Sequence, residues 1–243
     1  MTLARDFIYE CRRRWLQLKR RRIDYALEER QRVPKVAALF GIEEADISRY
    51  ESEYDSLSWF HDVFAERFQD IHHAGVSEET THWRDGKTLY VLCRALKPSV
   101  VVETGVRFGS FDAHILAALT KNEHGELHAL DLPGGPPGPF EYGYLIPDRC
   151  RSRWTFHACD ASTELESILS AVGPIDLFLH DSDHRAPHMR FEFSTAIPHI
   201  RPRGVLASHD VRLSSVFESV TSAHQFKSHI ICDTGIATRK RSE

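Results

Sequence analysis

The sequence lacks the features that mark several common protein classes. Its five cysteines are widely separated and form no C-x-x-C pair, which argues against zinc ribbons and disulfide frameworks and favours a reducing compartment. No apolar run approaches the roughly 20 residues that span a bilayer, and the N-terminus has no signal-peptide core. We therefore expect a cytoplasmic protein without a membrane span.

The chain also lacks the basic balance of a dedicated nucleic-acid binder, because its formal net charge is −4. Residues 1–35 nevertheless carry 11 Lys/Arg and 5 Asp/Glu, and apolar residues at three- and four-residue steps predict a basic amphipathic helix over about residues 3–32. Such a helix could meet an anionic membrane surface, an acidic partner or a nucleic acid. The acidic remainder favours a solvated face on a helix that packs against the core or a second subunit.

A third glycine is missing after the first predicted core strand. The run V-V-V-E-T-G-V-R-F-G-S at 100–110 leads from a strand through Gly105 and Gly109 into a predicted helix. This E-x-G-x-x-x-G pattern differs from the G-x-G-x-x-G fingerprint that seats a dinucleotide pyrophosphate. It suits a ligand with an amino group facing Glu103 and polar groups at the helix start near Ser110. Alternatively, Glu103 is only a strand-end charge.

Strand and helix patterns alternate from residue 85 to the end of the chain, and 243 residues are enough for one such domain with an appendage. The alternation predicts a doubly wound α/β fold with a mostly parallel seven-stranded sheet. The D-T-G at 233–235 predicts a hairpin turn, so the last two strands should be antiparallel. Residues 1–84 are expected to form an N-terminal helical extension, as a cap or as the surface of a homo-oligomer.

Polar residues end each of the five predicted parallel strands, where open sheets bind ligands. They are Glu103, Asp131, Asp160, the pair His180 and Asp181, and the pair His209 and Asp210. Asp131 is placed to accept the hydroxyls of a ribose, or else it caps a turn. Asp160 could accept from an adenine amino group, or it could have only a structural role just before Ser162, which is expected to cap the following helix.

The segment I-D-L-F-L-H-D-S-D-H predicts a second kind of chemistry at the fourth strand. Asp181 and Asp210 would supply hard oxygen ligands to a divalent cation, with His209 as a third ligand. His184 could take the proton of a hydroxyl bound there. The alternative is a set of hydrogen bonds within the sheet edge. The Gly/Pro-rich run at 132–153, which includes Tyr142 and Tyr144, is either a substrate loop or a disordered surface loop.

Taken in order, these motifs resemble the class I S-adenosylmethionine-dependent methyltransferases. The resemblance covers about residues 85–240 and is carried by E-T-G-V-R-F-G-S, Asp131, H-A-C-D-A-S, D-S-D-H, the G-V-L-A-S-H-D-V run and the closing T-G-I-A-T-R-K. More narrowly, the chain is similar to the small single-domain branch with D-x-x-H after the fourth strand, which includes sugar and antibiotic O-methyltransferases.

The resemblance implies roles for these residues. Glu103, Gly105 and Gly109 would flank the methionine part of the cofactor, with Ser110 beside them. Asp131 would hold the ribose, and Asp160 and Asp181 would complete the cofactor site. In metal-dependent relatives Asp181 and the pair at 209 and 210 correspond to ligands, and His184 to the general base. This chain departs from the pattern at His209, which suits Mg²⁺ poorly.

We therefore expect methyl transfer from S-adenosylmethionine to a hydroxyl of a small molecule, a sugar or a natural product. His184 would act as the base, with Mg²⁺ or another divalent cation as an aid. The alternatives are a scaffold that binds the cofactor without turnover and an NAD-dependent oxidoreductase, which the missing third glycine argues against.

Overall fold

The computed structural model describes residues 23–76 and 82–239. The predicted basic helix therefore lies largely outside the described residues. In its described part the prediction of one unbroken helix is wrong, because α2 (Tyr25–Arg30) has its own N-cap, Asp24, whose side chain accepts a hydrogen bond from Leu27 N at 3.0 Å. Within the described residues, no helix is both long enough and apolar enough to cross a membrane.

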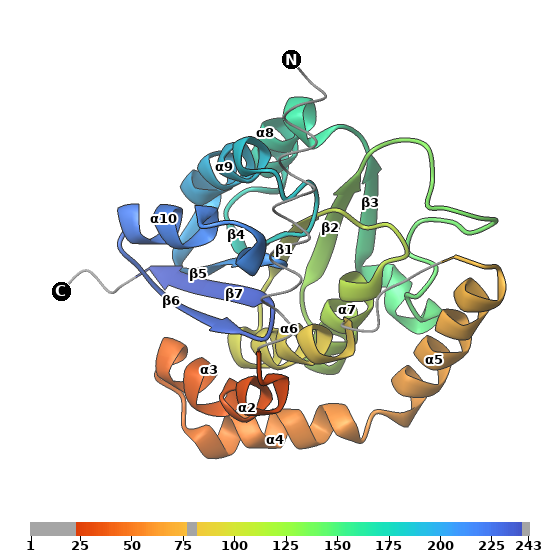
Figure 1. The fold of residues 1–243 in the computed structure, drawn as a ribbon, viewed down its shortest axis with the longest axis horizontal. Coiled ribbons are helices and arrows are strands. Elements are labelled where there is room, and N and C mark those ends of the chain that lie inside the picture. The colour runs from red at the N-terminus through yellow and green to blue at the C-terminus, as the bar shows by residue number, and fades with distance from the viewer. Residues whose placement is uncertain (1–22, 77–81, 240–243) are drawn as a thin grey trace.

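A single sheet forms the centre of the protein, in the order β3-β2-β1-β4-β5-β7-β6 (Figure 1). Its strands are β1 (Val100–Thr104), β2 (Glu126–Asp131), β3 (Trp154–Ala158), β4 (Ile175–His180), β5 (Ile200–Ser208), β6 (Phe226–Ile231) and β7 (Thr234–Arg239). Strands β1 to β5 are parallel, and β7 runs antiparallel to both β5 and β6. The predicted seven-stranded fold with an antiparallel last hairpin is confirmed.

The turn of that hairpin was placed wrongly by the D-T-G pattern. Ile231 pairs with Thr234, so the turn consists of Cys232, which has a φ of 54°, and Asp233. Gly235 lies within β7, and a Cβ atom there would come within 2.6 Å of the Phe217 ring. The glycine therefore allows α10 (Val216–Ala223) to pack closely on the sheet. The local sequence does not distinguish a glycine needed for such packing from one needed for a turn.

Helices cover both faces of the sheet (Figure 1). One face carries α6 (His82–Leu96) and α7 (Ser110–Asn122), and the other carries α8 (Ala161–Val172), α9 (Ala186–Ala196) and α10 (Val216–Ala223). Successive residues of a strand point to opposite faces of the sheet and so pack in different cores. Val101 and Leu177 belong to one core cluster, and Val102 and Phe178 belong to the other. The described residues also form 3-10 turns: η1 (Asp148–Arg153), η2 (Ile197–His199) and η3 (Val211–Leu213).

The N-terminal helical extension packs on the face that carries α6 and α7. It contains α3 (Arg32–Phe40), α4 (Glu44–Asp55) and α5 (Ser58–His73). Ile47, Phe60 and Phe64 are fully buried and belong to the same core cluster as Leu116 of α7. The division of the chain at residues 84 and 85, and a role of the extension in oligomers, stay predictions.

Candidate active site

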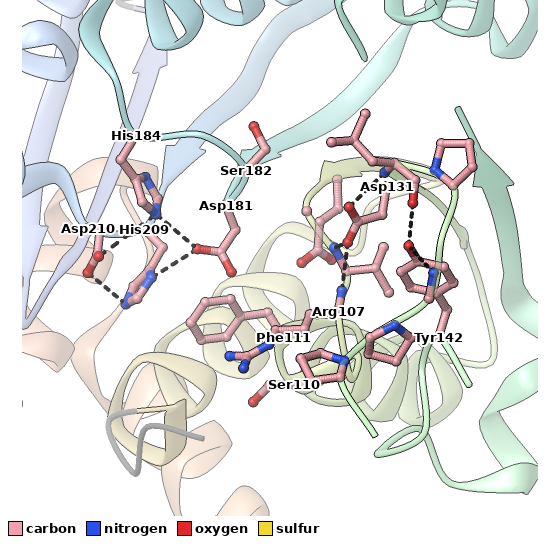
Figure 2. A pocket seen from close by; sticks show the side chains of 18 residues that line it. Arg107, Ser110, Phe111, Asp131, Tyr142, Asp181, Ser182, His184, His209 and Asp210 are labelled. Atoms are coloured by element: carbon pink, nitrogen blue, oxygen red, sulfur yellow. Dashed lines mark hydrogen bonds and ion pairs between the residues drawn. The ribbon is translucent and has the colours of Figure 1, made fainter. Parts of the chain in front are cut away.

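A cavity of about 520 Å³ lies beyond the C-terminal ends of β1, β2, β4 and β5 (Figure 2). Eight of the ten predicted site residues line it: Glu103, Gly105, Ser110, Asp131, Asp181, His184, His209 and Asp210. A neighbouring cavity of about 400 Å³ shares Gly105 and Asp131 with it and is lined by Asp160. Residues more than a hundred positions apart in the chain therefore meet at one edge of the sheet.

Gly105 allows the loops after β1 and β4 to touch. Its φ is 89°, and a Cβ atom would lie 2.4 Å from the Asp181 carbonyl oxygen. Gly109 has a φ of 76°, and a Cβ there would lie 2.7 Å from the Cα of Gly143. Gly109 does not line either cavity, so its effect on the site comes through the close approach of the 132–147 loop.

Glu103 places a buried carboxylate at the inner wall of the cavity. The residue is 1% exposed, and its Oε2 has no hydrogen-bond partner among the described residues. Burial raises its pKa well above the ordinary value, and the nearby Asp112, Asp181 and Asp131 add to that effect. A cationic group bound in the cavity would compensate this carboxylate.

Asp131 binds backbone as well as lining the cavity. Its Oδ2 accepts hydrogen bonds from Val106 N at 2.9 Å and Arg107 N at 2.8 Å, and its Oδ1 accepts from Leu132 N at 2.7 Å. A carboxylate has about four acceptor positions, so one remains on Oδ1 for a ligand. Asp131 thus fixes the glycine loop to the end of β2.

Asp160 is the N-cap of α8, since its carboxylate accepts from Ser162 N at 2.8 Å. The cap of this helix is therefore Asp160 and not the predicted Ser162. Asp160 also lines the smaller cavity. Ser110 lines the larger cavity as the first residue of α7. Its hydroxyl is buried and has no hydrogen-bond partner among the described residues.

Two carboxylates and two imidazoles face one another on the other side of the cavity (Figure 2). Asp181 Oδ1 lies 3.0 Å from His209 Nδ1 and 3.8 Å from His184 Nε2. Asp210 lies 3.8 Å from His184 and 3.5 Å from His209. One ligand atom each from Asp181, His184 and His209 lie within 4.8 Å of one another. This group shares Asp181 and His209 with the predicted ligand set but contains His184 in place of Asp210.

The two histidines differ in their protonation. Burial lowers the pKa of His184 to about 4, although Asp210 and Asp181 act in the opposite direction. Burial also disfavours a charge on His209, but Asp210 and Asp181 outweigh it and raise the pKa to about 10. At neutral pH, His184 is neutral and can accept a proton, whereas His209 is a cation between two carboxylates.

The 132–147 loop forms one wall of the cavity, through Pro133, Pro136, Pro137 and Tyr142. The Tyr142 hydroxyl accepts a hydrogen bond from Gly135 N at 3.0 Å and donates one to Leu132 O, which closes the loop on itself. Tyr144 points elsewhere and donates to Asp70 of α5 at 2.8 Å. Of the two tyrosines in the predicted substrate loop, only Tyr142 reaches the cavity.

Sequence reasoning missed four residues that build the site. Phe111 and Ser182 line the cavity, and the ring of Phe111 lies 4.8 Å from that of His209. Asp85 and Glu192 are completely buried carboxylates on the helices behind it. The one available signal was Glu192 in F-E-F, an acid within the apolar stripe of a predicted helix.

The fold is that of the class I S-adenosylmethionine-dependent methyltransferases. The comparisons agree with this class, because residues 102–211 match a family model described as a methyltransferase domain. The predicted resemblance and the prediction of a methyltransferase are thereby confirmed, in place of the dehydrogenase alternative. No curated protein sequence matches the chain significantly.

Solved structures share the fold at low sequence identity. Cofactor-bound Rv0187 from MTB is 15% identical with a TM-score of 0.59, over 77% of this chain and 94% of that chain. An O-methyltransferase from Bacillus cereus in complex with S-adenosylhomocysteine is 16% identical, with a TM-score of 0.54, over 79% and 97%. MycE of the mycinamycin biosynthetic pathway, with Mg and S-adenosylhomocysteine, is 15% identical with a TM-score of 0.51, over 75% and 53%.

Proposed function

We propose that the protein transfers the methyl group of S-adenosylmethionine to a hydroxyl of a small molecule, such as a sugar or a natural product. The observation that carries the proposal is the division of one cavity into two sides. Glu103, Ser110 and Asp131 lie on one side, and the neutral His184 stands among carboxylates on the other. The O-methyltransferase from Bacillus cereus, which has this fold, supports the reaction class.

The cofactor side has groups that fit the parts of S-adenosylmethionine. The buried, uncompensated Glu103 carboxylate suits the ammonium, and the unpartnered Ser110 hydroxyl at the start of α7 suits the carboxylate. The remaining acceptor position of Asp131 suits a ribose hydroxyl, and Asp160 lies in the adjoining cavity where an adenine would fit. The bound cofactor supplies a methyl group that positive sulfur already activates. The task of the protein is therefore alignment and deprotonation.

On the acceptor side, His184 takes the proton of the attacking hydroxyl, and the carboxylates of Asp181 and Asp210 stabilise the resulting imidazolium. Asp181 and Asp210 would hold a divalent cation, and His209 would become a third ligand once the cation displaces its proton. The cation would lower the pKa of a hydroxyl bound to it. A donor set that includes imidazole suits Mn²⁺ or another transition ion better than Mg²⁺. The Mg bound in MycE supports the presence of a divalent cation in this fold.

Turnover with a panel of hydroxyl-bearing sugars and natural products, read by mass spectrometry as a gain of one methyl group, tests the proposal. We expect His184→Ala to lower turnover by about 100- to 10,000-fold because general base catalysis is lost. Its affinity for S-adenosylhomocysteine should stay close to that of the wild type. His199→Ala is the matched control, because His199 is paired with Glu166 at 3.1 Å, outside both cavities.

Unchanged turnover in His184→Ala would remove this residue from the mechanism. A chelator should abolish turnover, and Mn²⁺ should restore it. Full activity in the presence of the chelator would show that the reaction needs no divalent cation. The proposals of methyl transfer and of His184 as the base would still stand. Tight cofactor binding without turnover of any acceptor would favour the scaffold alternative.

A further inference from the structure

A buried carboxylate lies behind the two cavities and lines neither of them. Glu192 of α9 is 0% exposed. Burial opposes its charge, but hydrogen bonds from His180 and His188 outweigh burial and hold the pKa of Glu192 below its ordinary value. The group is therefore an ionised acceptor inside the protein.

Four donors surround this carboxylate. Oε2 accepts from the Thr104 hydroxyl at 2.6 Å and from His180 Nδ1 at 2.6 Å. Oε1 accepts from the Ser182 hydroxyl at 2.7 Å and from His188 Nε2 at 2.8 Å. Since a carboxylate offers about four acceptor positions, Glu192 is saturated by this set.

The donors come from the chain segments that carry the site. Thr104 ends β1 and precedes Gly105, and His180 ends β4. His180 and Ser182 lie on either side of Asp181, so the carboxylate holds both neighbours of that residue. The same segment leads directly to His184.

The geometry points to Glu192 as the positioning residue of the acceptor side, because its carboxylate fixes residues 180–184 so that Asp181 and His184 face the cavity. This inference rests on the proposed function, because the term acceptor side assumes that a methyl acceptor binds next to His184. Glutamine has the same shape as glutamate but brings two N–H donors among four existing donors. Glu192→Gln therefore keeps the buried volume, removes the negative charge and replaces one of the two accepting oxygens with a donor.

The test compares Glu192→Gln with Glu53→Gln. Glu53 of α4 is a partly buried acceptor, bound to Tyr90 at 2.6 Å and Arg94 at 2.5 Å, and it lies outside both cavities. Long-range ¹H–¹⁵N NMR spectra report the rings of His184 and His209 without any ligand. We expect Glu192→Gln to shift both ring signals and Glu53→Gln to leave them at their wild-type positions.

For an acceptor that the wild type methylates, Glu192→Gln should lower kcat by about 100-fold with little change in KM, because a small misplacement of reacting groups has this effect. Wild-type ring signals in a folded Glu192→Gln variant would overturn the inference, as would equal shifts in Glu53→Gln. If Glu192→Gln does not fold, Ser182→Ala decides the question: shifted ring signals support the inference, and unchanged signals overturn it. If no acceptor is methylated, the proposed function fails while the NMR comparison still decides the role of Glu192.

Discussion

Among single residues, Asp131 connects backbone structure to ligand binding. In Asp131→Asn the amide oxygen can still accept from Val106 N and Arg107 N. The NH₂ group then takes the place of Oδ1, where it faces the Leu132 N–H and cannot accept a hydrogen bond from a ligand hydroxyl. A hydrogen bond to a charged group contributes about 1.5–3 kcal/mol, so we expect the Kd for S-adenosylhomocysteine to rise by about 10- to 100-fold. Isothermal titration calorimetry measures this change.

Asp176→Asn is the matched control for that variant. The Asp176 carboxylate also accepts from two backbone amides, Ser99 N at 2.8 Å and Val100 N at 3.0 Å, but at the opposite end of the sheet. It should leave the affinity for S-adenosylhomocysteine unchanged. If Asp131→Asn binds S-adenosylhomocysteine as tightly as the wild type does, the carboxylate only holds the glycine loop and does not bind the cofactor.

His188 gives a residue-scale prediction about pH. Its hydrogen bond to Glu192 raises its pKa above the ordinary value, although burial acts the other way. A group whose pKa is raised by folding stabilises the protein below its unfolded pKa of about 6.5, and the effect is lost as the pH rises through the folded pKa. The wild type should therefore exceed His188→Gln in free energy of unfolding by about 1 kcal/mol near pH 5.5, and by less at alkaline pH. Urea unfolding at several pH values measures the difference, and a difference independent of pH would contradict the assignment.

At the scale of helices and strands, the elements that carry the cofactor side could be predicted. Each parallel strand is a short apolar run with a charged residue at or just beyond its end, and such residues must meet at one sheet edge. The helix-borne acids could not be found in this way. Asp85 and Glu192 reach the site through the packing of α6 and α9, and a local pattern does not show which neighbour a helix face will meet. The hairpin turn was wrongly predicted at Gly235 for the same reason. A glycine is needed there because the Phe217 ring of α10 packs against the strand, and that contact is not visible in the local sequence.

The contact between the ends of β1 and β4 predicts a strong effect of Gly105→Ala. A methyl group there meets the Asp181 carbonyl in a backbone conformation that already strains alanine. We expect a loss of at least about 2 kcal/mol in the free energy of unfolding, with loss of cofactor binding. Gly41→Ala is the control, because Gly41 has a φ of 66° but nothing within 4 Å of the added atom. Equal effects in the two variants would show that backbone strain alone is responsible.

For the whole molecule, the open question is whether the helical extension and the sheet domain unfold together. The ring of Phe64 in α5 lies 5.0 Å from that of His114 in α7, and both side chains are fully buried. Phe64 belongs to the same core cluster as Leu116 of α7. Phe64→Ala should lower the free energy of unfolding by about 3–5 kcal/mol because it leaves a cavity in that core. If the core is shared, native-state hydrogen exchange should show the same loss in peptides from α5 and from β4.

Phe191→Ala serves as the control, since Phe191 of α9 is 36% exposed and its removal should change the exchange of both peptides little. A Phe64→Ala variant in which α5 exchanges faster while β4 keeps its wild-type protection would show that the extension is an independent unit, divided near residue 84. Equal losses would mean that the helices before α6 belong to the stability of the methyltransferase itself. The site at the ends of β1 and β4 would then depend on them, because Ser110 begins the helix against which Phe64 packs.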